Sequence, residues 1–110
     1  MITHLTITDF QPQATDIIWD VRDAKAYAEG HWQPAQHQAL ESISLATLQT
    51  LPSEQTIYVL CGGGTKAGRA AQLIEELDKQ RQVVILTGGT RAAKAAGLPM
   101  VEGFKQEASS

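Results

Sequence analysis

The chain has 110 residues, which is enough for one domain with a buried core, and we expect no second domain within residues 1–110. Its formal net charge of −3 comes without a basic block or a long apolar run, so neither a nucleic acid nor a membrane is expected as a partner. The first five residues do not resemble a secretory signal and a single cysteine excludes an internal disulfide, so we expect a cytoplasmic protein.

Apolar runs along the chain alternate with helical patterns. Continuous apolar character, typical of parallel strands buried on both faces, marks strong strands at residues 17–21, 56–60 and 83–86. Weaker strands are expected at residues 5–6 and 39–40. Helical patterns cover residues 23–29, 45–51, 65–79 and 90–96. This alternation predicts an α/β fold in which helices cover a parallel sheet.

Two further segments have no regular pattern. Residues 31–38 lack a period and contain a proline, so we expect a connecting loop of the kind that often forms one wall of a site. Residues 105–110 have the composition of a frayed tail.

The most informative residue is the only cysteine, Cys61, which follows a predicted strand and precedes Gly62, Gly63 and Gly64. A helix is predicted to begin near Thr65, because the apolar residues beyond it repeat with helical spacing. Ligands of open α/β sheets usually bind at the carboxyl ends of the strands, and backbone amides at a helix start stabilise a thiolate. The alternative is a buried structural cysteine beside an ordinary glycine turn.

Charged side chains extend this interpretation. Lys66 and Arg69 lie in a first helical turn, where cations oppose the helix dipole, so we expect them to face an anion. Asp20 and Arg22 close the strand at residues 17–21 and would lie at the same sheet edge as Cys61. The alternative for the carboxylate is that Asp20 or Asp23 caps the next helix.

The remaining motifs favour structural roles. His31 follows Gly30 and is typical of a helix end, whereas His4 and His37 have no partner at metal-ligand spacing, so no metal site is expected. The segment at residues 87–90 (TGGT) either binds phosphate or forms a tight strand-to-helix turn, and it matches neither common phosphate-binding pattern. Trp19 and Trp32 are expected in the core and in loop packing.

Taken in order, six short motifs are more specific than any one of them. They are DVR at residues 20–22, AY at 26–27, GH at 30–31, the cysteine loop from residue 61, GG at 88–89 and KAAGLP at 94–99. Over residues 17–101 this order resembles the rhodanese family, whose single-domain members carry similar motifs in the same order and which includes sulfurtransferases.

The resemblance implies a three-layer α/β/α fold with a five-stranded parallel sheet and a persulfide on Cys61, with no cofactor. By this resemblance, amides of Gly62, Gly63, Gly64, Thr65 and Lys66 would stabilise the persulfide. Lys66 would attract the donor, and Asp20 and Arg22 would brace the site from below. The implied partners are thiosulfate or a related donor and a cyanide, thiol or protein acceptor.

Some positions depart from the family pattern. Gly62 replaces a residue that is often basic or bulky, Thr87 replaces an acid, and Ala93 replaces a tryptophan. The segment at residues 32–34 (WQP) also replaces the usual isoleucine-proline-glycine.

Two alternatives stay open. Cysteine phosphatases and arsenate reductases of a similar fold use a C-x5-R loop, but Ala67 stands where that arginine would be. The second alternative is a non-enzymatic interaction or sulfur-carrier module built on the rhodanese-like scaffold.

Overall fold

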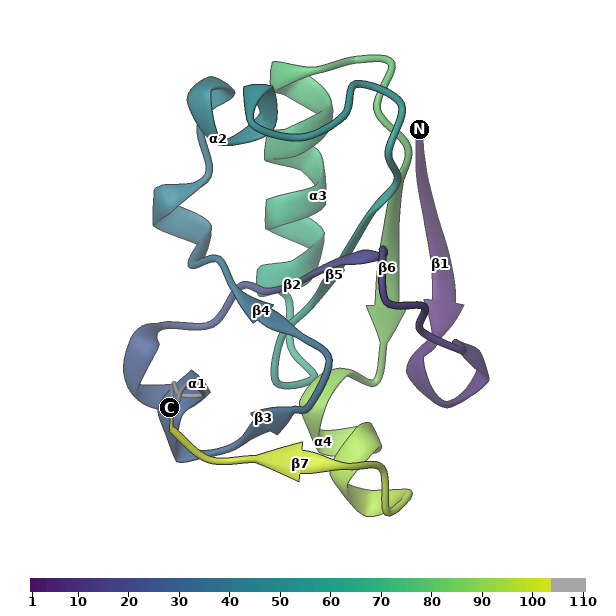
Figure 1. Ribbon diagram of the computed structural model, residues 1–110, viewed down its shortest axis with the longest axis vertical. Helices are drawn as coiled ribbons and strands as arrows, with labels where there is room; N and C mark the ends of the chain where they lie inside the picture. Colours follow the sequence, from purple (N-terminus) through teal and green to yellow (C-terminus); the bar gives the residue numbers. More distant parts are fainter. Residues whose placement is uncertain (104–110) are drawn as a thin grey trace.

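A five-stranded parallel sheet organises the computed structural model, which describes residues 1–103 (Figure 1). Its strands are β1 (Ile2–Thr6), β2 (Ile17–Asp20), β4 (Gln36–His37), β5 (Ile57–Leu60) and β6 (Val83–Thr87). The spatial order is β1-β6-β5-β2-β4, and every neighbouring pair is parallel. In this register Asp20 lies opposite Leu60, so the residues after β2 and β5 emerge side by side at one sheet edge.

Helices and turns connect the strands. The helices are α1 (Ala24–Glu29), α2 (Leu45–Gln49), α3 (Lys66–Leu77) and α4 (Gly89–Ala95), with 3-10 turns η1 (Ile7–Asp9) and η2 (Leu40–Ser42). An antiparallel pair, β3 (His31–Trp32) and β7 (Met100–Val101), lies beyond the carboxyl edge of the large sheet together with α4 (Figure 1).

Two buried clusters lie on opposite faces of the sheet, because successive strand residues point to alternate sides. Trp19 and Val59 pack with the buried face of α3, which includes Ile74. Ile18 and Leu60 belong to the other cluster. Its further members include Ile7, Trp32, Leu86 and Ala93, so both tryptophans lie in the core, as expected for Trp19, while Trp32 was expected in loop packing. The three-layer α/β/α architecture is therefore confirmed.

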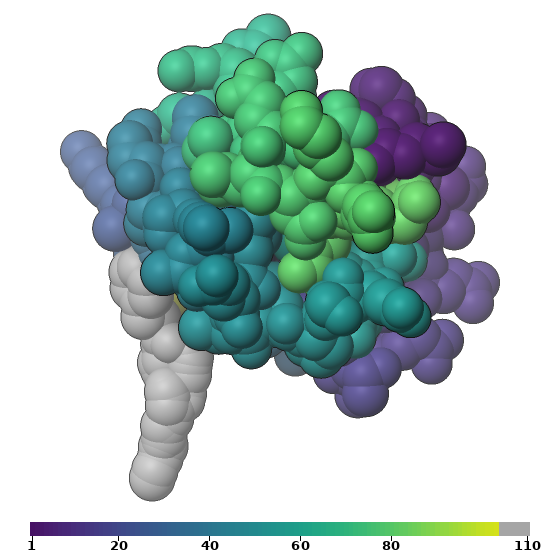
Figure 2. Space-filling view, turned by 90° about the horizontal axis from the view of Figure 1, so that it is seen from above, coloured from purple at the N-terminus to yellow at the C-terminus, as the bar shows by residue number. Residues whose placement is uncertain are grey.

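The amino end of the sheet is closed by a buried arginine. Arg81 donates hydrogen bonds to the carbonyl oxygens of Pro52 at 2.6 Å and Gln55 at 2.9 Å, and pairs with Asp78 at 3.1 Å. Figure 2 looks onto this end, where green residues around position 80 lie beside teal residues from the 50s. The catalytic candidates lie at the other end of the sheet.

The structure confirms the strong strands and the four helices but corrects two expectations. Residues 39–40 are not a strand: Ala39 precedes the 3-10 turn η2, and its neighbour Leu40 donates a backbone hydrogen bond to Val21 at 3.1 Å. The fifth strand is β4 instead, within the segment expected to be only a loop, which also holds β3. Two-residue strands are too short to show a period. The tail predicted at residues 105–110 lies outside the described residues.

Candidate active site

Cys61 lies at the carboxyl end of β5, where the chain enters the loop that leads to α3. Its side chain is 5 % exposed, and it lines a cavity of about 330 Å³ together with Gly63, Gly64 and Thr65. His4, from the neighbouring edge of the sheet, lines the same cavity. The cysteine therefore faces a hollow whose wall combines the glycine loop with residues of β1 and β6.

The first turn of α4 is attached to this loop by its backbone. The amide of Thr90 donates to the carbonyl oxygen of Cys61 at 2.8 Å, and the amide of Arg91 donates to that of Gly62 at 3.3 Å. Gly89 has φ +58°, and a Cβ atom there would overlap the carbonyl oxygen of Cys61. Gly88 and Gly89 thus form the tight turn that brings α4 against the loop.

A dense hydrogen-bond network lies beneath the loop. Asp20 is fully buried and accepts from Arg22 Nε at 2.9 Å and Nη2 at 2.8 Å, a bidentate pair. Arg22 Nη2 also donates to the carbonyl oxygen of Gly30 at 2.8 Å. The helix cap is a separate carboxylate, Asp23, which accepts from the amide of Ala26 at 2.8 Å. The two carboxylates therefore have different roles, one bracing and one capping.

We call the Asp20–Arg22 pair the brace, and aromatic side chains lie close to it. The Tyr27 hydroxyl donates to the carbonyl oxygen of Ala35 at 2.7 Å, and its ring stacks on that of His31 with centroids 3.6 Å apart. Burial, and secondarily the negative charge of Asp20, raise the pKa of Tyr27 above its ordinary value of 10.0. His31 Nδ1 lies 2.9 Å from the carbonyl oxygen of Tyr27, which confirms its predicted place at a helix end.

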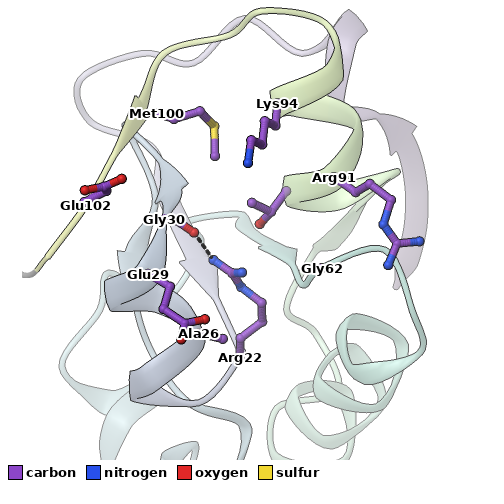
Figure 3. A pocket seen from close by; sticks show the side chains of 10 residues that line it. Arg22, Ala26, Glu29, Gly30, Gly62, Arg91, Lys94, Met100 and Glu102 are labelled. Carbon is purple, nitrogen blue, oxygen red and sulfur yellow. Dashed lines mark hydrogen bonds between the residues drawn. The ribbon is translucent and has the colours of Figure 1, made fainter.

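A second cavity, the α1–α4 pocket, flanks the loop on the side of α1, α4 and β7 (Figure 3). Its volume is about 670 Å³, and its lining includes Arg22, Glu29, Gly62, Thr90, Arg91 and Lys94. Figure 3 shows Lys94 extending into it from α4, while the Arg91 side chain lies beside the loop that carries Gly62. A Cβ atom at Gly62 would lie 3.8 Å from Arg22 Cδ, so the missing side chain leaves this pocket open to the loop.

The predicted cations are placed differently from one another. Lys66 is half-buried at the first position of α3, and it lines neither of the cavities beside the loop. Arg69 is exposed and lines a separate hollow with Glu41 and Leu73. Ala67 is 3 % exposed and packs in the core cluster, so the position that carries arginine in a C-x5-R loop faces inward here.

Within residues 1–103, no group of three or more histidine, cysteine, aspartate or glutamate side chains is arranged to hold a metal ion. No helix in the same part of the chain is long and apolar enough to cross a membrane.

The fold and the site define a class: a parallel α/β domain with one cysteine at the mouth of a glycine loop on the carboxyl edge of its sheet. The model of the rhodanese-like domain matches residues 7–96, and the chain belongs to this family. No curated protein sequence matches the chain significantly.

Solved structures agree with this assignment. The rhodanese-like domain of the Alr3790 protein from Anabaena sp. is 30% identical, with 78% of this chain and 86% of that chain covered and a TM-score of 0.69. The BH2092 protein from Bacillus halodurans is 26% identical over 96% of this chain and 82% of that chain, with a TM-score of 0.78. A thiosulfate sulfurtransferase from Pseudomonas aeruginosa has the same fold at 24% identity and a TM-score of 0.79, with 92% of this chain and 20% of that chain covered.

Sequence reasoning missed two residues at the site. His4 belongs to the edge strand β1, whose alignment with the Cys61 loop depends on the order of strands in the sheet. Arg91 contacts the loop because the positive φ angles of Gly88 and Gly89 place the first turn of α4 against it. In the sequence, His4 is considered only as a histidine without a metal-ligand partner, and Arg91 belongs to no motif singled out there.

Proposed function

We propose that the protein is a rhodanese-type sulfurtransferase that carries sulfane sulfur as a persulfide on Cys61. The observation that supports this most directly is the position of its only cysteine, which lines a cavity of about 330 Å³ walled by the glycine loop. Backbone amides at the start of a helix stabilise a thiolate, and the same hydrogen-bond donors stabilise a persulfide anion.

The chemistry has two displacement steps. The thiolate of Cys61 attacks the outer sulfur of thiosulfate, and the sulfur–sulfur bond of the donor breaks with its electron pair leaving on sulfite. A cyanide or thiolate acceptor then attacks the terminal sulfur of the persulfide. The acceptor leaves as thiocyanate or as a persulfide, and the Cys61 thiolate is regenerated.

Each predicted residue has a role in this proposal. Amides of residues 62–66 stabilise the persulfide, Lys66 adds positive charge at the start of α3, and the Asp20–Arg22 pair holds the strand ends beneath the loop. The acceptor is a small thiol, cyanide or a thiol on another protein. We propose the cytoplasm as the compartment, where reduced thiols are abundant.

Intact mass spectrometry tests the proposal. Thiosulfate treatment should add one sulfur atom to the wild type, and cyanide should remove it. Cys61→Ser should gain no mass under the same conditions while keeping the same circular dichroism spectrum. An unchanged wild-type mass, with a native spectrum, would contradict sulfur transfer and favour a non-enzymatic interaction module.

A further inference from the structure

The loop around Cys61 contains no side-chain cation of its own among its first four residues after the cysteine. Gly62, Gly63 and Gly64 have no side chains, and Thr65 is uncharged. A dianionic donor such as thiosulfate approaches a thiolate, so two anions must be brought together. A cation near the loop would lower this electrostatic cost.

Besides Arg22, which is already paired with Asp20, Arg91 is a second cation that the structure places against the loop. Its Nη1 atom lies 3.7 Å from the position that a Cβ atom would take at Gly63, and Gly63 lines the cavity of Cys61. The backbone amide of Arg91 is hydrogen-bonded to Gly62, so the base of this side chain is fixed relative to the loop. Its guanidinium is exposed and has no hydrogen bond or ion pair to any of residues 1–103.

A second observation points to a ligand in the α1–α4 pocket, which Arg91 also lines. Thr90 is 7 % exposed, lines the α1–α4 pocket beside Arg91, and its hydroxyl has no hydrogen-bond partner in the described part of the chain. Buried hydroxyl groups are normally paired, so an unpaired one that lines the same pocket as Arg91 is consistent with a ligand that completes the site. Lys94, one helical turn along α4, adds a further positive charge to the wall of this pocket.

We propose that Arg91 is a specificity-determining residue that binds the anionic end of the sulfur donor, with the Thr90 hydroxyl as a second donor of a hydrogen bond. The proposal rests on the sulfurtransferase function above and names the donor class: a small oxyanion such as thiosulfate, whose sulfonate end is held from α4. Arg91 thereby supplies from another helix the positive charge that Gly62 lacks.

Sulfur loading of Cys61 from thiosulfate tests the charge requirement. Arg91→Ala should lower kcat/KM for thiosulfate by about three- to tenfold, mainly through KM, and the loss should shrink at high salt. Arg69→Ala, which removes an exposed helical arginine lining a separate hollow, is the matched control and should behave as the wild type. Equal thiosulfate kinetics in Arg91→Ala and Arg69→Ala would overturn the proposal.

Alkylation of Cys61 separates failure of this inference from failure of the proposed function. Iodoacetate is an anion and iodoacetamide is neutral, and neither reaction needs sulfur transfer. The ratio of the two rates should fall about threefold or more in Arg91→Ala and stay constant in Arg69→Ala. A fall in this ratio without any sulfur loading would refute the enzyme but keep the anion site. An unchanged ratio, or a Cys61 that reacts with neither reagent, would refute the anion site.

Thr90→Val probes the second contact without changing side-chain volume greatly. The variant should keep or increase its melting temperature, because it removes an unpaired buried hydroxyl. Its KM for thiosulfate should nevertheless rise about twofold to fivefold. A variant with an unchanged KM would show that the donor does not contact Thr90, leaving Arg91 alone in the site.

Discussion

The loop around Cys61 and the brace beneath it are built in opposite ways. The loop has almost no side chains, and its contacts with α4 are backbone hydrogen bonds from Thr90 and Arg91. The brace consists of side chains: a fully buried carboxylate, Asp20, held by the guanidinium of Arg22. Chemistry at the loop depends on where the backbone lies, whereas the strand ends are held together by charged groups.

This difference separates stability from reactivity. A substitution in the brace leaves a buried charge without its partner. This lowers the free energy of unfolding, whether or not the brace takes part in the reaction at Cys61. A substitution in the loop adds a side chain, which shifts the backbone amides that surround Cys61 wherever the backbone packs closely. The two regions should therefore respond to different kinds of mutation.

The largest effect is expected where a side chain is forced between the loop and α4. Gly89→Ala should lower the free energy of unfolding by about 2–5 kcal/mol, because the added methyl group overlaps the Cys61 carbonyl oxygen and φ is +58°. Gly64→Ala is the control, since no atom lies within 4 Å of its would-be Cβ. Urea denaturation measures both. Equal midpoints in the two variants would show that the contact with α4 is not tight.

In the brace, Asp20→Ala should lower the free energy of unfolding by about 1–3 kcal/mol, because it leaves Arg22 without its partner. Asp23→Ala removes a more exposed capping carboxylate and should cost about 1 kcal/mol. Sulfur loading per folded molecule should persist in both variants. An Asp20→Ala protein with full stability and no loading would make Asp20 a catalytic residue instead of a brace.

A smaller effect is expected at Lys66. Lys66→Ala should slow sulfur loading from thiosulfate by about two- to threefold, less than Arg91→Ala, because Lys66 lines neither cavity beside the loop. Loading rates at low and high salt measure this effect. A loss greater than that of Arg91→Ala would place the donor on the α3 side of the loop.

The smallest effect is the pH dependence that Tyr27 adds to stability under alkaline conditions. Because the pKa of Tyr27 is raised above 10.0, the unfolded chain loses this proton first as the pH rises, and stability falls once the pH exceeds about 10. Tyr27→Phe should flatten this fall, while losing roughly 1 kcal/mol at neutral pH with the hydrogen bond to Ala35. Urea midpoints from neutral to alkaline pH measure both. Parallel curves would refute the contribution of Tyr27.

The sequence was sufficient to predict the central strands, because β2, β5 and β6 are apolar runs that stay buried whatever their neighbours are. It was not sufficient for β4, whose residues Gln36 and His37 are polar and whose pairing depends on β2 being beside it. The position of Cys61 was predictable, because ligands of open α/β sheets bind at the carboxyl ends of the strands and Cys61 directly follows a strand. The position of Arg91 did not, since it depends on the backbone angles of Gly88 and Gly89.

The contact between Gly89 and the loop also limits the size of the anion that the loop can enclose. A phosphoryl group needs a wider ring of amides, and a residue inserted between Cys61 and Lys66 would meet the first turn of α4, which is hydrogen-bonded to the loop at two points. Ala67 is buried in the same core cluster as Cys61, so an arginine in its place would have to displace buried neighbours. Conversion of this domain to phosphate chemistry would therefore have to begin by displacing α4, a helix that contains none of the reacting atoms.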